Sequence, residues 1–126
     1  MEENFSLSLP AQPKNVRVAR LTLAAIASRL PFDVEQIEDM KLAVAEACNN
    51  VIEHAKETQQ IEMEFKIKAD KLDIIVKDQG KGFGPQATKD SPGLGLVFMQ
   101  SLMDEVEFKP LIPSGTQVRM AKKFPA

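Results

Sequence analysis

Glu46 and Asn50 have the side-chain types and the spacing of a functional pair. They stand four residues apart in a long helical pattern, so both would lie on one face of a helix. A carboxylate there can accept a proton, and an amide oxygen can bind a hard cation such as Mg²⁺. Polar side chains on a helix more often form a solvated face, so the pair does not define a site by itself.

A second group follows a predicted strand. Asp78 stands at the end of that strand, and Gly80 and Gly82 come directly after it. Taken alone, this pattern is usually a turn. In a binding site, the carboxylate would accept a hydrogen bond from an exocyclic amine, and the glycines would let the backbone approach a flat ring.

A third group, Gly93, Leu94 and Gly95, begins a predicted helix. Backbone N–H groups at the first turn of a helix bind phosphate, and the positive end of the helix dipole lies behind them. The segment lacks the third glycine of a dinucleotide-binding fingerprint and the Gly-Lys-Ser/Thr of a Walker loop. The pattern therefore indicates phosphate binding only weakly.

The elements that would position these groups follow from apolar periodicity. Strands are predicted at 4–9, 61–67, 72–76, 105–109 and 116–121, and helices at 16–30, 33–56 and 94–103. The first strand meets Pro10, which favours an edge position, and Asp33 with Gln36 resembles a capping box. The element order predicts an α/β two-layer sandwich, with a mixed, mostly antiparallel sheet and three main helices on one face.

Composition limits the possible functions. The 126 residues suit one domain, residues 1–126, and the net charge of −2 argues against direct binding to nucleic acid. Cys48 and His54 are the only residues of their types, which excludes an intramolecular disulfide and a metal centre rich in Cys or His. Because apolar runs are short and the N-terminus is acidic, we expect no membrane span and a cytoplasmic location.

The three groups together, in this order, resemble the N, G1 and G2 boxes of the Bergerat-fold (GHKL) ATPases and kinases. Within that fold, residues 39–55 look like the N box of bacterial anti-sigma-factor serine/threonine kinases. Arg20 with its helix, residues 102–106, and Gly115 with Thr116 fit the same family. The resemblance extends from the first strand to Met120 and implies the Bergerat, histidine-kinase-like ATPase fold.

The resemblance also implies roles for single residues. Glu46 would be the general base, and Asn50 a ligand of the Mg²⁺ that accompanies ATP. Asp78 would accept the adenine amino group, with Thr116 nearby, and Arg20 would contact protein partners. The remaining ATP-binding residues would be Gly80, Gly82, Gly93, Leu94 and Gly95.

The function implied by the resemblance is that of a Mg²⁺–ATP-dependent protein serine kinase and anti-sigma factor. It would sequester a sigma factor, phosphorylate a serine on a STAS-type anti-anti-sigma antagonist, and form a homodimer. One alternative is a non-catalytic ATP-binding regulatory module, because residues 83–92 contain no arginine and Lys89 is their only cation. Another is a histidine kinase catalytic fragment, which is disfavoured because no phosphoacceptor histidine segment precedes the first strand.

Overall fold

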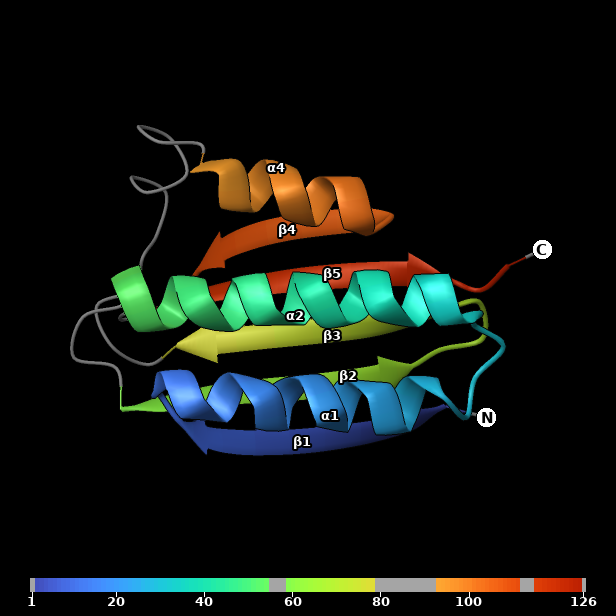
Figure 1. Cartoon of the computed structure of the whole chain (residues 1–126), viewed down its shortest axis with the longest axis horizontal. Helices are drawn as coiled ribbons and strands as arrows, with labels where there is room; N and C mark the ends of the chain where they lie inside the picture. Colours follow the sequence, from blue (N-terminus) through green and yellow to red (C-terminus); the bar gives the residue numbers. More distant parts are fainter. Residues whose placement is uncertain (1, 55–58, 79–92, 112–114, 126) are drawn as a thin grey trace.

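The computed structural model describes residues 2–54, 59–78, 93–111 and 115–125. Within these ranges, a five-stranded sheet is covered on one face by three α-helices (Figure 1). The predicted α/β two-layer sandwich is confirmed. The strands are β1 (Glu3–Pro10), β2 (Gln60–Ile67), β3 (Lys71–Asp78), β4 (Glu105–Pro110) and β5 (Thr116–Lys123). The helices are α1 (Val16–Ala27), preceded by the 3-10 turn η1 (Pro13–Asn15), α2 (Val34–His54) and α4 (Gly93–Leu102).

The strand order is β1-β2-β3-β5-β4, and each neighbouring pair of described strands is antiparallel. The predicted sheet was mixed and mostly antiparallel, whereas none of the described strand pairs is parallel. Strands β1 and β2 are antiparallel because α1 and α2 run in opposite directions and return the chain to the end of the sheet where β1 finishes (Figure 1). The edge position predicted for the first strand is confirmed, and Pro10, which has no N–H to donate, lies at its end.

The core lies between the sheet and the helices. Leu23 of α1 and Met40 of α2 are fully buried there, as their helical spacing predicts. Strand β2 contributes a residue at every second position, and these residues face the helices: Ile61, Met63, Phe65 and Ile67.

The start of α2 is fixed by the predicted capping box. The N–H of Gln36 donates to Oδ1 of Asp33 at 2.8 Å, and the N–H of Asp33 donates to Oε1 of Gln36 at 3.0 Å. Helix α1 ends at Ala27, three residues before the predicted end. Residues 55 and 56, predicted as the end of α2, lie outside the described residues.

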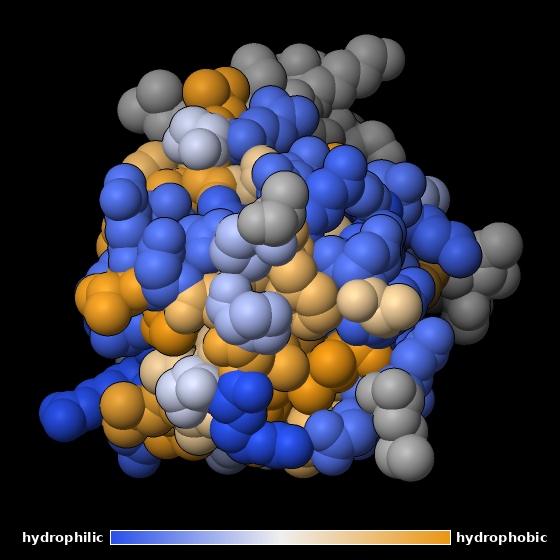
Figure 2. All heavy atoms as spheres, turned by 90° about the vertical axis from the view of Figure 1, so that its right-hand side faces the viewer, coloured by the Kyte–Doolittle hydropathy of each residue, from blue (hydrophilic) through white to orange (hydrophobic). Residues whose placement is uncertain are grey.

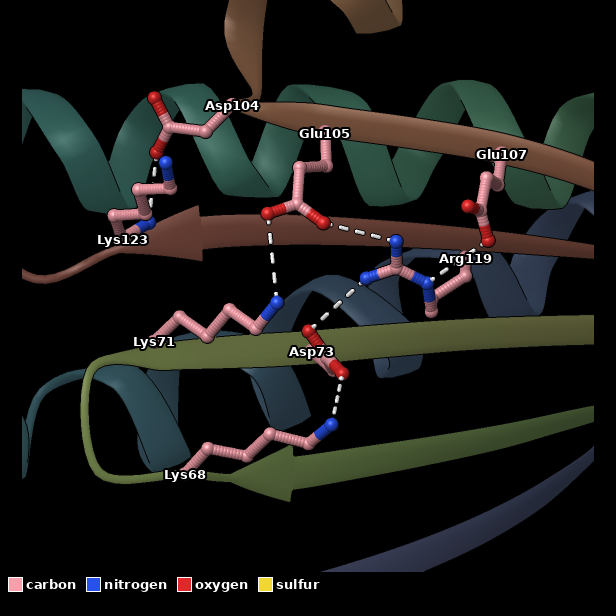
Figure 3. A network of polar contacts seen from close by, with 8 residues as sticks. All are labelled: Lys68, Lys71, Asp73, Asp104, Glu105, Glu107, Arg119 and Lys123. Carbon is pink, nitrogen blue, oxygen red and sulfur yellow. Dashed lines mark hydrogen bonds and ion pairs between the residues drawn. The ribbon is translucent and has the colours of Figure 1, made fainter.

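The opposite face of the sheet carries a network of ion pairs around Asp73, which is buried in β3 (Figure 3). The guanidinium of Arg119 donates to Asp73 at 3.3 Å, to Glu105 at 2.9 Å and to Glu107 at 3.2 Å. Lys68 lies 3.0 Å from the second carboxylate oxygen of Asp73. The hydrogen bond from Arg119 lowers the pKa of Glu105, and the same bond raises the pKa of Arg119. Charged partners thus compensate the burial of the Asp73 carboxylate.

Both termini lie at one end of the molecule, on the right of Figure 1. Figure 2 looks onto that end and shows apolar surface between hydrophilic areas. Phe32, after α1, and Phe124, after β5, have ring centroids 5.2 Å apart. None of the described helices is both long and apolar enough to cross a membrane.

Candidate functional site

The predicted site residues gather at the other end of the molecule, on the left of Figure 1. There β3 finishes, β5 begins, α2 reaches its last turns and α4 starts. Four elements that are distant in sequence therefore meet at one edge of the sandwich. The antiparallel order places them there, because β3 and α2 arrive at this end while α4 and β5 leave from it.

The side chains of Glu46 and Asn50 lie next to Gly95, which is in the first turn of α4. A Cβ atom placed on Gly95 would lie 2.5 Å from Oε2 of Glu46 and 3.4 Å from Nδ2 of Asn50. The first distance is far shorter than a van der Waals contact, so a side chain at Gly95 would force the Glu46 carboxylate to move. Two of the three predicted groups thus form one cluster, at the N-terminal end of a ten-residue helix.

Asp78 and Thr116 form a second cluster where β3 meets β5. They are cross-strand partners, both are buried, and the N–H of Thr116 donates to Oδ2 of Asp78 at 2.9 Å. Gly115 directly precedes Thr116 and has a φ of 103°, a left-handed conformation that glycine adopts without strain. Asp78 has no exposed surface, and a carboxylate at such a position needs charge-compensating or hydrogen-bonding partners.

Of the other predicted ATP-binding residues, the structure describes some and not others. Gly93 and Leu94 form the first two positions of α4, as expected. Gly80, Gly82 and the segment 83–92 lie outside the described residues.

A cleft of about 380 Å³ opens between α2 and α4, and we call it the α2–α4 cleft. Its described lining consists of Glu46, Gly95, Val97, Phe98 and Ser101. The sequence analysis did not single out the last three residues. The sequence does contain a pattern that could have predicted an exposed apolar surface here, namely the run from Val97 to Met99. Three consecutive apolar residues of a helix cannot all face the core, so some of them must be exposed. Met99 is buried, whereas Val97 and Phe98 are exposed.

A second cleft, of about 290 Å³, lies between α1 and α2, and we call it the α1–α2 cleft. Arg17, Arg20, Leu21 and Lys41 line it. Arg17 and Arg20 are three residues apart and line the same side of α1, whereas the sequence analysis singled out Arg20 alone. The Nε atom of Arg20 is buried and has no hydrogen-bond partner among the described residues. The cleft is therefore a concentration of positive charge that suits a carboxylate.

The described residues offer little other chemistry. Across the described ranges, no group of three or more His, Cys, Asp or Glu side chains is placed to hold a metal ion. Burial raises the pKa of the Cys48 thiol to about 12, so it stays protonated at neutral pH. Cys48 is thus a small core residue rather than a nucleophile.

The fold and the two clusters define the class of this protein. Residues 9–122 match the family described as histidine kinase-like ATPase domain, and the chain belongs to it. Among solved structures, the RsbU and RsbW domains of Rv1364c from Mycobacterium tuberculosis match with a TM-score of 0.76, 20% identity, and 98% of this chain and 34% of that chain covered. The histidine kinase domain of the Erythrobacter litoralis EL346 blue-light activated histidine kinase gives a TM-score of 0.64 and 17% identity, over 92% and 62% of the two chains. These two likenesses concern the fold.

Curated relatives place the chain more narrowly. It is 40% identical to the serine-protein kinase RsbW of Bacillus licheniformis and 39% identical to that of Bacillus subtilis (strain 168), over 94% of this chain and 84% of each relative. The RsbW of Listeria monocytogenes is 37% identical over 97% and 88% of the two chains. The chain therefore belongs to the RsbW serine-protein kinase family, which confirms the predicted family and enzyme class. The alignments run over 136 to 140 positions, so the relatives have residues without a counterpart in this chain of 126 residues.

Proposed function

We propose that residues 1–126 form one Mg²⁺–ATP-dependent protein serine kinase domain that acts as an anti-sigma factor. In this proposal the protein sequesters a sigma factor and phosphorylates a serine on a STAS-type anti-anti-sigma antagonist. ATP, sigma factors and such antagonists are cytoplasmic, so the proposal places the protein in the cytoplasm without direct contact to nucleic acid. The observation that carries the proposal is the close approach of Gly95 to Glu46 and Asn50 at the start of α4.

The described residues fit a bound nucleotide. The first turn of α4 begins beside Asn50, and backbone N–H groups at a helix N-terminus are suited to bind phosphate. The buried carboxylate of Asp78 provides an acceptor for the adenine amino group, with Thr116 beside it. Gly80, Gly82, Gly93 and Leu94 complete the ATP-binding set of the proposal.

A magnesium ion also fits, with Asn50 as its protein ligand. Mg²⁺ in phosphate-transferring sites is commonly held by one or two protein oxygens together with substrate phosphates and water. A single amide oxygen therefore suffices, and the absence of a carboxylate cluster from the described residues agrees with this arrangement. Asn50 also lies beside the first turn of α4, where a phosphate would bind.

The chain's own part in the chemistry centres on Glu46. Bound ATP supplies the phosphoryl group and ADP as the leaving group. The carboxylate of Glu46 accepts the proton that the serine hydroxyl loses as its oxygen bonds to the γ-phosphorus and the bond to the bridging oxygen breaks. The carboxylate lies against Gly95, where no side chain separates it from α4.

The α1–α2 cleft provides a surface for protein partners. Arg17, Arg20 and Lys41 present three positive charges, and Lys41 also pairs with Glu38 at 2.9 Å. A carboxylate of a partner would satisfy the buried Nε of Arg20. We therefore propose that Arg20 contacts the sigma factor, the antagonist or both, and that the protein does so as a homodimer.

A non-catalytic ATP-binding module remains the second candidate. Residues 83–92 have no arginine and Lys89 as their only cation, whereas phosphoryl transfer requires charge neutralisation around the γ-phosphate. Two variants separate binding from transfer. Replacement of Glu46 by Gln should lower transfer of labelled γ-phosphate to a STAS protein by about 10²–10⁴-fold and leave ATP affinity unchanged. Replacement of Asn50 by Ala should weaken Mg²⁺-dependent ATP binding.

The matched control is Glu35→Gln, which changes an exposed glutamate in the first turn of the same helix, whereas Glu46 is half-buried. It should leave both ATP binding and transfer at the parent level. Transfer by the Glu46 variant at the parent rate would remove the general-base role. ATP binding without any transfer by the parent protein would favour the regulatory module.

A further inference from the structure

The α2–α4 cleft combines a carboxylate with exposed apolar side chains. Val97 and Phe98 of α4 are 56% and 40% exposed, although both are large and apolar. Glu46 of α2 belongs to the same lining. An apolar surface that ends at the proposed general base is not explained by nucleotide binding.

We propose that the α2–α4 cleft is the docking groove for the segment of the protein substrate that carries the acceptor serine. In this inference, an apolar side chain next to that serine packs against Val97 and Phe98. The inference rests on the proposed function, in which Glu46 accepts the proton of the serine.

Access to Glu46 is the first argument. A serine hydroxyl must come within about 2.6–3.2 Å of the carboxylate that accepts its proton. Gly95 already lies against Oε2 of Glu46, so the approach along the first turn of α4 is occupied by backbone. The cleft reaches Glu46 along the surfaces of α2 and α4, so a segment lying in it would not have to displace the buried core.

The polarity of the cleft is the second argument. The hydroxyl of Ser101 donates to the carbonyl oxygen of Phe98 at 2.6 Å, so it is already engaged within α4. Glu46 provides the one charge in the described lining, and its sign repels phosphate. A neutral, partly apolar peptide segment therefore fits the cleft better than a nucleotide phosphate or an acidic sequence.

The two clefts differ in a way that supports separate roles. The α1–α2 cleft has three cations in its lining, which suit acidic groups, whereas the described lining of the α2–α4 cleft has no cation. A volume of about 380 Å³ lies within the range of ligand-binding clefts. A substrate that used both would place acidic residues against Arg17 and Arg20 and an apolar residue against Phe98.

The single buried cysteine makes a selective test possible. Cys48 is buried and its pKa is about 12, so a maleimide reacts with an added surface cysteine instead. The test protein is Val97→Cys carrying fluorescein maleimide. The control is Val34→Cys with the same label, since Val34 is 78% exposed at the start of α2 and does not line the cleft. The probes are the purified STAS-domain proteins of the source genome, each offered with γ-³²P-labelled ATP.

The labelled Val97 variant should show a loss of about tenfold or more in kcat/KM for the phosphorylated STAS protein, with ATP affinity within twofold of the control. A second variant, Phe98→Ala, should raise KM for that protein about tenfold and leave kcat within twofold, because the side chain contributes binding rather than chemistry. Both positions are exposed, so neither change should disturb folding.

Four results would overturn the inference. Equal transfer by both labelled proteins would show that the cleft is not used by the substrate. Loss of ATP affinity on labelling at Val97 would assign the cleft to the nucleotide. A change of oligomeric state in light scattering would make it a contact between copies of this chain. Failure of the unlabelled parent to phosphorylate any STAS protein would instead remove the proposed function itself, and the inference with it.

Discussion

Replacement of Gly95 by Ala should make the protein slightly more stable and much less active. The added Cβ would lie 2.5 Å from Oε2 of Glu46, so the carboxylate must retreat by about 1 Å to reach ordinary contact distance. That carboxylate is the end of a flexible side chain, so its movement costs the fold little. A misplacement of about 1 Å in a catalytic group lowers kcat by about 100-fold. Gly95 is helical, and alanine there stabilises the helix by about 0.5 kcal/mol, which corresponds to about 2 °C in Tm.

The assay compares γ-phosphate transfer to a STAS protein with thermal unfolding of the same samples. Gln100→Ala, an exposed change on the same helix, controls for helix propensity and should leave transfer unchanged. A Gly95→Ala protein with the parent's kcat would refute the reasoning, because Glu46 would then tolerate displacement. A fall of several degrees in Tm would show that the packing of α4 on α2 had been disturbed instead.

The remaining predictions concern the adenine acceptor, the partner surface and the ion network. Asp78→Asn should weaken ATP binding by about 2–4 kcal/mol, because an amide replaces a charged acceptor; equal calorimetric affinities for ATP and GTP in the parent would contradict that role. Arg20→Ala should weaken binding to the sigma factor, the antagonist or both by about thirtyfold, with ATP affinity and Tm nearly unchanged; unchanged affinity for every partner in titrations would make Arg20 a structural residue. The hydrogen bond from Arg119 lowers the pKa of Glu105 below 4.5, so its contribution to stability is present above pH 4.5 and is lost as the pH falls through the folded-state pKa. Urea unfolding between pH 3 and 7 should show this loss, and Arg119→Met should flatten it; an unchanged pH dependence in that variant would count against the coupling.

Most of the fold could be predicted from the sequence because local patterns and tertiary packing agree. The alternation of β2 and the reciprocal bonds of Asp33 and Gln36 are both set by neighbouring residues. The end of α1 at Ala27 was less predictable, because Leu30 continues the apolar spacing and only Pro31 marks a stop. The ion network was missed, although a charged residue at 73 within an apolar run indicates a partner on a neighbouring strand.

The central residues of the candidate site could be predicted from the sequence, but the residues that line the two clefts could not. The spacing of Glu46 and Asn50 places them on one helical face, and their proximity to Gly95 agrees with the predicted grouping. The clefts depend on how helices pack against one another, which no local pattern specifies. For that reason Lys41 and Phe98 could be assigned to clefts only from the structure.

The hydrogen bond between Asp78 and Thr116 has a consequence for the order of folding. The two residues are 38 positions apart, and their contact forms only when β5 pairs with β3. Such long-range pairing must overcome loop-closure entropy before its contacts stabilise the chain, so it belongs to the slow part of folding. A nucleotide that uses the Asp78 carboxylate would bind only the completed sheet and, at 100 times its Kd, would stabilise it by about 2.7 kcal/mol. Cellular ATP would then favour completion of the sheet during synthesis, when β5 leaves the ribosome after the other four described strands.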